Sequence, residues 1–256
     1  MSRLAIVAAM HDELRAVLQA MPDEVPQVRA GREFWVGHLD GHKVVAVLAG
    51  VGKVAAATTA TLLITEFDVD RIVFTGVAGG LGEHVRVGDV VVADGLTQHD
   101  MDASPLFPRF EVPLTGVSRF VPDAALSDVL WRAAQAVLAE AAGAQGEHLD
   151  GARLQAFGIT APHVHRGLII SGDRFVSTQD ESEALREALP EALAVEMEGA
   201  ALAQVCHDFG VHCAVVRTVS DRADDAAHVD FNRFMAEVAA HYSLAIVRRA
   251  LRLLAA

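Results

Sequence analysis

The sequence predicts a single-domain α/β protein whose helices cover a largely parallel or mixed sheet. The chain has 256 residues, of which 52% are hydrophobic and 21% charged, so it can bury a large core and is not a disordered chain. Short runs of Val and Ile are continuous rather than alternating, which indicates strands that are buried on both faces. Helical patterns lie between these runs, and this alternation is typical of α/β folds.

The strands are expected where β-branched residues concentrate. The first lies at residues 4–8, and Asp12 and Glu13 interrupt the apolar stretch too early for a signal peptide. The other strands are expected at residues 43–48, 71–75, 89–93, 167–171 and 213–219.

Helices are expected where apolar residues recur at intervals of three and four. After the first strand, Leu14, Val17, Leu18 and Met21 form one apolar stripe. Further helices are expected at residues 54–64, 123–142, 199–209 and 231–254. Residues 98–120 and 143–166 lack such a pattern, and long irregular segments within a domain are usually functional loops or insertions.

Charge and composition exclude several classes of function. The net charge of −13 argues against a nucleic-acid or anionic-membrane partner, because phosphate surfaces are bound by basic residues. A run of about 18 apolar residues is absent, so no transmembrane helix is expected. Cys206 and Cys213 are expected to be buried thiols in a reducing compartment, the cytoplasm. His163 and His165 lack a third ligand at convincing spacing, so no metal site is predicted.

Two glycine-rich segments border expected strands. Residues 50–53 lack the earlier glycine of a P-loop, and residues 76–82 do not match the dinucleotide-binding fingerprint. Glycines at the carboxyl end of a buried strand nevertheless let backbone N–H groups approach a ligand. The second segment is therefore either part of a binding site or a tight turn.

Carboxylates follow three apolar stretches. Glu13, Glu198 and Asp221 each lie where an expected strand ends, the edge at which α/β sheets gather their ligands. Each one alone is explained as a helix cap or first-turn acid. Together they indicate a site in which neighbouring carboxylates raise one pKa, so that one group can act as an acid and another as a base.

At this point the chain resembles the 5′-methylthioadenosine/S-adenosylhomocysteine nucleosidases of the purine nucleoside phosphorylase superfamily. The matching blocks occur in the family's order, at residues 6–13, 50–57, 75–81, 87–92, 171–175, 195–198 and 216–221. The resemblance implies one domain over residues 1–256, a three-layer α/β/α sandwich around a mixed, partly barrel-like sheet. Residues 98–166 match poorly and look like a divergent insertion.

The resemblance also implies an activity: hydrolysis of the adenine N-glycosidic bond of methylthioadenosine and adenosylhomocysteine. It implies no cofactor, a homodimer and a setting in methionine salvage. Carried over by position, Asp221 protonates the adenine ring at N7 and Ser220 supports that aspartate. Glu13 activates water, which Arg217 helps to position.

The same resemblance assigns the residues that bind substrate. Met197 and Glu198 hold the ribose, with Glu198 on its hydroxyls. Phe175 stacks on adenine, and the backbone of Val176 reads the edge of the base.

Met10 and Phe231 line the pocket for the 5′-alkylthio group, and Val77, Ala78 and Gly79 lie against the substrate. One departure concerns Val77, because nucleosidases of this family often carry a serine there whose hydroxyl helps to hold the attacking water. The valine side chain cannot form that hydrogen bond.

Three other functions stay open at this stage. A phosphate-dependent phosphorylase is disfavoured because Asp12 and Glu13 would repel phosphate. A futalosine-type nucleosidase differs only in the 5′ substituent, although Asp221 favours a 6-amino purine. An inactive nucleoside-binding paralogue is supported only by Val77. Residues 98–166 are a candidate to carry Phe107 or Pro113 to the pocket of a neighbouring subunit.

Overall fold

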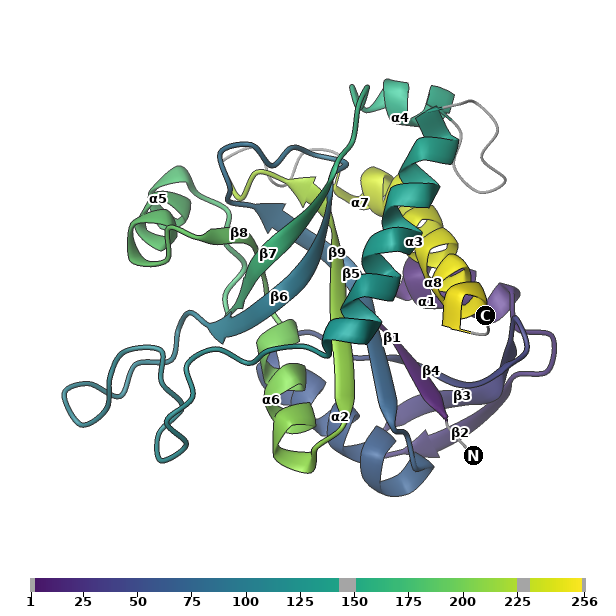
Figure 1. Cartoon of the computed structure of the whole chain (residues 1–256), viewed down its shortest axis with the longest axis horizontal. Coiled ribbons are helices and arrows are strands. Elements are labelled where there is room, and N and C mark those ends of the chain that lie inside the picture. The colour runs from purple at the N-terminus through teal and green to yellow at the C-terminus, as the bar shows by residue number, and fades with distance from the viewer. Residues whose placement is uncertain (1–2, 143–150, 225–230, 255–256) are drawn as a thin grey trace.

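Nine strands form one continuous sheet in the computed structural model, which describes residues 3–142, 151–224 and 231–254. Their order in the sheet is β2-β3-β4-β1-β5-β8-β7-β6-β9 (Figure 1). In chain order the strands are β1 (Leu4–Ala8), β2 (Val25–Arg29), β3 (Arg32–Leu39), β4 (His42–Leu48), β5 (Arg71–Gly80), β6 (Val90–Gln98), β7 (Val164–Ser171), β8 (Ala192–Glu196) and β9 (His212–Asp221).

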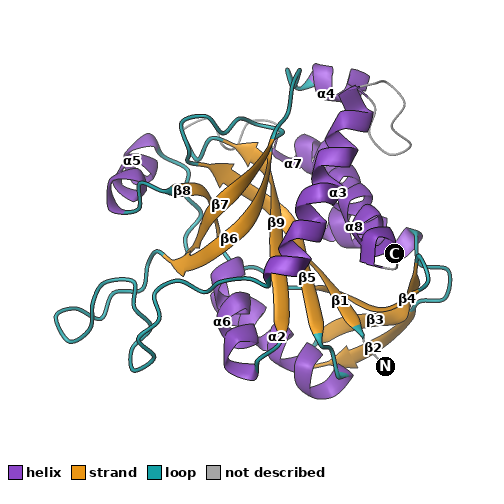
Figure 2. Cartoon of the chain, viewed as in Figure 1, coloured by secondary structure: helices purple, strands orange, loops and turns teal. Residues whose placement is uncertain are grey.

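The sheet closes on itself at one end. Strand β5 pairs with β8 on one side and with β9 on the other, so β5, β8, β7, β6 and β9 form a ring. Within this ring β5 and β9 run parallel, whereas β6 and β9 run antiparallel. Figure 2 shows these strands curving around one another, and the predicted mixed, partly barrel-like sheet is therefore confirmed.

Helices cover the sheet on two sides. The helical elements are α1 (His11–Gln19), α2 (Lys53–Phe67), α3 (Ala124–Ala142), α4 (Gly151–Ala156), α5 (Gln179–Ala188), α6 (Gly199–Phe209), α7 (Phe231–Phe234), the π-helix η1 (Met235–Ala239) and α8 (Ala240–Leu254). Helices α1, α3 and α8 pack together on one side, and α2 and α6 pack together on the other (Figure 1).

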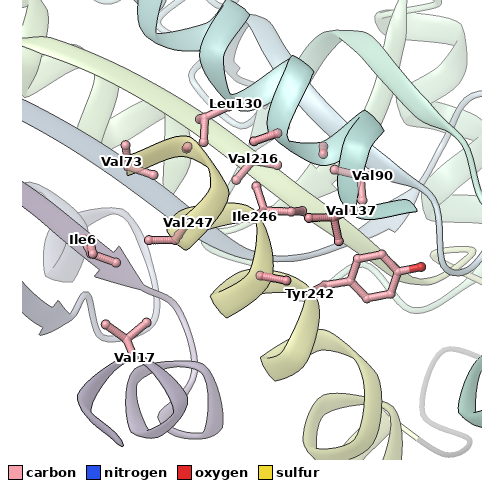
Figure 3. Close-up of a cluster of buried hydrophobic side chains, with 14 of the residues drawn as sticks. Ile6, Val17, Val73, Val90, Leu130, Val137, Val216, Tyr242, Ile246 and Val247 are labelled. Atoms are coloured by element: carbon pink, nitrogen blue, oxygen red, sulfur yellow. The ribbon is translucent and has the colours of Figure 1, made fainter. Parts of the chain in front are cut away.

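The first side contains a large apolar core. Tyr242 and Ile246 of α8 meet Leu130 of α3 there, over side chains from β1, β5, β6 and β9 (Figure 3). Since these side chains are almost fully buried, α8 is packed firmly against β1, β5, β6 and β9.

The expected strands at residues 4–8, 43–48, 71–75, 89–93, 167–171 and 213–219 are all confirmed, although several are longer. Strand β5 continues through its glycines because Gly79 and Gly80 pair with β8 instead of turning. Strands β2 and β3 were not expected. Strand β2 contains Pro26 and is largely exposed at the edge of the sheet, so it lacks the apolar run of a buried strand.

The helix predictions hold with corrections at the ends. The helices at 54–64, 123–142 and 199–209 are confirmed as α2, α3 and α6. Helix α1 ends before Met21, and the region 231–254 divides into α7, η1 and α8. Helix α5 was not expected. The irregular segment expected at 143–166 is wrong in part, because α4 and the start of β7 lie within it and residues 143–150 fall outside the described residues.

The chain between β6 and α3 forms a long irregular excursion, as expected for residues 98–120. It leaves the body of the molecule as extended loops (Figure 2) and returns to the sheet where Phe120 bridges to Leu96. Among the described residues, no helix is both long and apolar enough to cross a membrane.

Candidate active site

A cavity of about 240 Å³ opens where several strands end. Its walls come from the ends of β1, β5, β8 and β9 and from the segment that follows β7. The sequence-predicted residues that line it are Met10, Val77, Ala78, Gly79, Phe175, Val176, Met197, Glu198, Ser220 and Asp221. Residues from distant parts of the chain are thus brought to one place.

The other predicted residues do not line the cavity. Glu13 and Arg217 are fully buried, and each is connected to a lining residue by a hydrogen bond. Phe231 begins α7, but its side chain lies outside the described residues.

Glu13 lies in the first turn of α1, just after β1 ends. One carboxylate oxygen, Oε2, accepts the backbone N–H of Met10 at 3.0 Å, as in a capping box. The other, Oε1, accepts the hydroxyl of Ser243 at 2.8 Å. Burial raises the pKa of Glu13 above its ordinary value, and the hydrogen bond from Ser243 and the charge of Arg217 partly offset that rise. The helix-cap and functional interpretations of this residue are therefore compatible.

Arg217 lies on β9 and forms a buried ion pair that sequence reasoning missed. Its Nη2 donates to Oε2 of Glu196 at 2.7 Å, and its guanidinium carbon lies 4.0 Å from the ring centre of Phe74. Gly76 on β5 makes room for this side chain, since a Cβ there would come within 3.2 Å of Nη1. Within the described part of the chain, Nε of Arg217 has no hydrogen-bond partner, so one donor remains available for a small ligand.

Glu196 is held by the start of α6. Both of its carboxylate oxygens accept the backbone N–H of Gly199, at 3.0 and 2.8 Å, and Ser171 also donates to it. A carboxylate is favoured at a helix N-terminus because the free N–H groups there carry partial positive charge. Glu196 is thereby fixed in place, and it holds the guanidinium of Arg217.

Glu198 lies at the N-cap of α6, two residues after Glu196. Its Oε1 accepts the backbone N–H of Gly52 at 2.9 Å. Burial, together with the nearby charge of Glu196, raises the pKa of Glu198 to about 7. A neighbouring carboxylate therefore does raise one pKa, but that carboxylate is Glu196, which was not among the three expected acids.

Asp221 is the last residue of β9. The Ser220 hydroxyl donates to its Oδ2 at 2.7 Å, and the backbone N–H of Ala223 donates to its Oδ1 at 2.7 Å. Gly79 on β5 packs closely against this turn, because a Cβ there would lie 3.0 Å from Oδ1 and 2.8 Å from Cβ of Ala223. Asp221 is thereby held in one orientation at the cavity wall.

The segment after β7 carries Phe175, which is 44% exposed at the cavity. This segment is tied to the start of α2, since the backbone N–H of Lys53 donates to Asp173 at 2.7 Å. Asp100 links the two, accepting from Nζ of Lys53 at 2.6 Å and from the backbone of Asp173 at 2.9 Å. The aromatic ring is thus presented from a braced loop.

Sequence reasoning missed some of the cavity wall. Glu196 stood within a matched block, but its distance from Glu198 did not reveal that it pairs with Arg217. The other lining residues that were not expected are Ala9, Val51, Arg174 and Val195. No group of three or more His, Cys, Asp or Glu is arranged to hold a metal ion among the described residues.

The arrangement suits the cleavage of a bond between a basic heterocycle and a sugar. The carboxyl group of Asp221 and the aromatic ring of Phe175 line the cavity where a heterocycle could bind, and Glu198, a carboxyl with a pKa near neutrality, can accept from hydroxyl groups. A buried carboxylate beside an arginine donor can hold and activate water.

Comparisons with known proteins agree with this geometry. The family model of the phosphorylase superfamily matches residues 3–252. The chain is 33% identical, over 96% of its length and 97% of the relative's, to the 5′-methylthioadenosine/S-adenosylhomocysteine nucleosidase of Shewanella denitrificans. Its fold is similar to the nucleosidase of that name from Neisseria meningitidis in complex with methylthio-immucillin-A, with a TM-score of 0.85, 32% identity and coverage of 99% and 100% of the two chains.

A second solved structure is similar to nearly the same degree. The futalosine hydrolase of Helicobacter pylori matches with a TM-score of 0.81 and 28% identity, covering 98% of each chain.

Proposed function

This chain belongs to the 5′-methylthioadenosine/S-adenosylhomocysteine nucleosidases of the phosphorylase superfamily, and from that premise we propose how it acts on its substrate. It is an N-glycosyl hydrolase that releases adenine from methylthioadenosine and adenosylhomocysteine. The observation that carries the assignment is that Asp221 and Glu198 line one cavity, while the buried Glu13 is hydrogen-bonded to Met10 in its wall.

Asp221 is the general acid that delivers a proton to N7 of adenine. Adenine leaves poorly as an anion, so the bond breaks only when a proton reaches the ring. The hydroxyl of Ser220 supports this role, because a hydroxyl can donate to the ionised carboxylate or accept from the protonated acid. Asp221 therefore stays oriented in both protonation states.

Glu13 is the general base for the attacking water, and Arg217 helps to position that water. The raised pKa of Glu13 supports this role because it makes the carboxylate a stronger base than one in water. The unpartnered Nε of Arg217 supplies a donor to the water oxygen.

The remaining lining residues hold the substrate. Glu198 accepts from the ribose hydroxyls beside Met197, and its negative charge stabilises the oxocarbenium-like sugar that forms as adenine departs. Phe175 stacks on adenine while the backbone of Val176 reads its edge. Met10, together with Phe231, forms the pocket for the 5′ substituent.

Water, rather than phosphate, is the nucleophile. The buried positive charge of Arg217 is already paired with Glu196, and Glu13 adds a further carboxylate on the same side. A phosphate dianion at this place would meet net negative charge in a poorly screened site.

The test is adenine release from methylthioadenosine by the purified protein, with and without added phosphate. We expect equal release in both conditions. Release that requires phosphate would mean a phosphorylase and would overturn the assignment of Glu13.

Futalosine-type substrates are the second candidate, because the fold is similar to the futalosine hydrolase of Helicobacter pylori. These substrates differ in the group attached to the 5′ carbon. Comparing kcat/KM for methylthioadenosine, adenosylhomocysteine and a futalosine-type nucleoside separates the two functions. We expect the two sulfur-containing substrates to be preferred.

We also propose an oligomeric state, a cellular compartment and a pathway for the enzyme. A homodimer is supported by large apolar side chains that stand exposed on the excursion between β6 and α3, among them Leu106 and Leu114. We place the enzyme in the cytoplasm, within methionine salvage, where the thioribose product is used again.

A further inference from the structure

Two buried hydroxyl groups stand behind Glu13, on the side away from Met10. Ser243 of α8 donates to Oε1 of Glu13 at 2.8 Å, and Thr75 of β5 donates to the Ser243 oxygen at 2.8 Å. All three residues are at most 2% exposed. The three groups therefore form a short chain of hydrogen bonds that joins α8, β5 and α1.

The direction of these hydrogen bonds follows from the carboxylate of Glu13 at one end of the series. An ionised carboxylate can only accept, so the Ser243 proton must point to Glu13. The Ser243 oxygen is then free to accept from Thr75. Each hydroxyl proton therefore has one acceptor, and this series of hydrogen bonds favours the ionised form of Glu13.

Ser243 is unusual for its place on the helix. It is 1% exposed and belongs to the buried face of α8, together with Tyr242 and Ile246, which pack into the apolar core. A buried hydroxyl is costly unless it is hydrogen-bonded, and an apolar residue would suit such a helix face better. Its partners at this position are Glu13 and Thr75, which argues for a role at the site rather than in packing.

The preceding π-helix contributes to this placement. The π-helix η1 runs directly into α8, and a π turn contains about one residue more than an α turn. The extra residue rotates the following side chains by roughly 100° about the helix axis. This rotation sets the phase in which Ser243 faces Glu13.

We propose that Ser243, supported by Thr75, is the positioning residue for Glu13, holding its Oε1 so that Oε2 is directed to the attacking water. The inference rests on the proposed role of Glu13 as the base. Val77, which lines the cavity, has no side-chain donor, so the orientation of Glu13 depends on Ser243 and on the backbone N–H groups of Met10 and Ala9.

The groups around Glu13 predict how the pH dependence of kcat should change when Ser243 is replaced. Arg217, from β9, is the charged group that acts on it, whereas the link between β1 and α1 contributes the backbone N–H groups of Ala9 and Met10. The Ser243 hydroxyl is the largest influence that lowers the pKa of Glu13 against the effect of burial. Removing the hydroxyl should therefore move the acidic limb of the kcat profile to higher pH.

The experiment compares Ser243→Ala with Glu13→Gln, Thr75→Val and Thr75→Ser. We expect Ser243→Ala to lower kcat by about 10- to 100-fold, the factor carried by one hydrogen bond to a charged group, with little change in KM. Thr75→Val should give a smaller loss, and Thr75→Ser should retain the wild-type rate because it keeps the hydroxyl.

The matched control is Ser127→Ala, which removes another buried hydroxyl far from the site; Ser127 Oγ has no hydrogen-bond partner within the described residues. It should leave kcat and the pH profile unchanged. Ser243→Ala with wild-type kcat and acidic limb, while Glu13→Gln is inactive, would overturn the positioning role alone. An active Glu13→Gln variant would overturn both this role and the proposed base.

Discussion

The three carboxyl groups that meet at the site differ in their partners. Glu13 is surrounded by a hydroxyl, a backbone N–H and an arginine charge, and Glu198 by a backbone N–H and a second carboxylate. Asp221 accepts a serine hydroxyl and a backbone N–H at the cavity wall. The same functional group thus stands in three different environments, and we propose that it serves as the base in Glu13, as the hydroxyl acceptor in Glu198 and as the acid in Asp221.

The acid role predicts a specific loss in Asp221→Asn. The amide keeps the shape of the side chain and its bonds to Ser220 and Ala223, but it cannot deliver a proton. We expect kcat to fall by about 10²–10⁴-fold, the usual contribution of one general acid, with nucleoside binding retained. Single-turnover kinetics and calorimetric titration with methylthioadenosine measure the two quantities. Unchanged turnover would exclude Asp221 as the acid.

Glu198 predicts a pH dependence of folding stability. Its pKa rises from 4.5 to about 7 on folding, so its contribution to stability is fully present below pH 4.5 and is lost as the pH rises through about 7. Glu198→Gln cannot ionise and keeps an acceptor for Gly52, so it should stabilise the free protein at pH 8 by on the order of 1–3 kcal/mol.

Thermal melts at pH 5 and pH 8 without substrate measure this effect. The variant should gain at pH 8 and gain much less at pH 5, and it should also lose turnover through its weakened grip on ribose. An equal gain at both pH values would contradict the shift.

At the scale of the elements, the ends of β5 and β9 pack closely together and hold the side chain of Asp221 in place. Gly79 lies where β8 and β9 both pair with β5, and the backbone of β9 shifts register there. The space at Gly79 is filled by Asp221 and Ala223, so the strand can accept no side chain at this position.

Gly79→Ala should therefore disturb the acid more than the fold. The new Cβ forces Asp221 to move, and we expect kcat to fall at least about tenfold, with overpacking costing about 1–3 kcal/mol of stability. Gly80→Ala is the control, because its Cβ would press on Val219 and Val85 rather than on the carboxyl group. Activity assays and thermal melts of both variants test this, and equal losses of kcat would refute it.

The sequence predicted some strands better than others. Strands β1, β6 and β9 were found because continuous Val and Ile runs mark strands that are buried on both faces. Strand β2 gave no such signal because it lies exposed at the edge. For Gly79 and Gly80 the sequence left open a binding segment or a tight turn, and only their pairing with β8 extends the strand.

The site shows a similar division between local and long-range information. Nine of the predicted cavity residues stand in short blocks that resemble the family's, at the ends of strands, and Val176 directly follows such a block. Glu196 and Ser243 were missed because their roles arise from contacts across the fold. Ser243 is separated from Glu13 by 230 residues and lies in an ordinary helical pattern.

At the scale of the whole molecule, the excursion between β6 and α3 is the main feature that one subunit leaves unexplained. Leu106, Leu114 and Val121 are 83%, 90% and 76% exposed on it, and apolar side chains in this number usually cover a partner surface. Phe175 and Val51 are also exposed, and both line the cavity. The proposed second subunit would cover these exposed side chains.

This arrangement predicts that assembly and substrate binding fail together in Leu106→Asp/Leu114→Asp. Two charges placed in an apolar interface cannot be desolvated cheaply, so the double variant should be a monomer. If Phe107 or Pro113 reaches the neighbouring pocket, KM should rise by about tenfold or more, the effect of losing one apolar contact of substantial area. Val28→Asp is the control, because Val28 is exposed on β2, at the opposite end of the sheet order from β6. Sedimentation velocity and steady-state kinetics are measured on the same samples. A monomeric double variant with an unchanged KM would mean that each pocket is complete within one subunit, and a dimeric one would place the interface elsewhere.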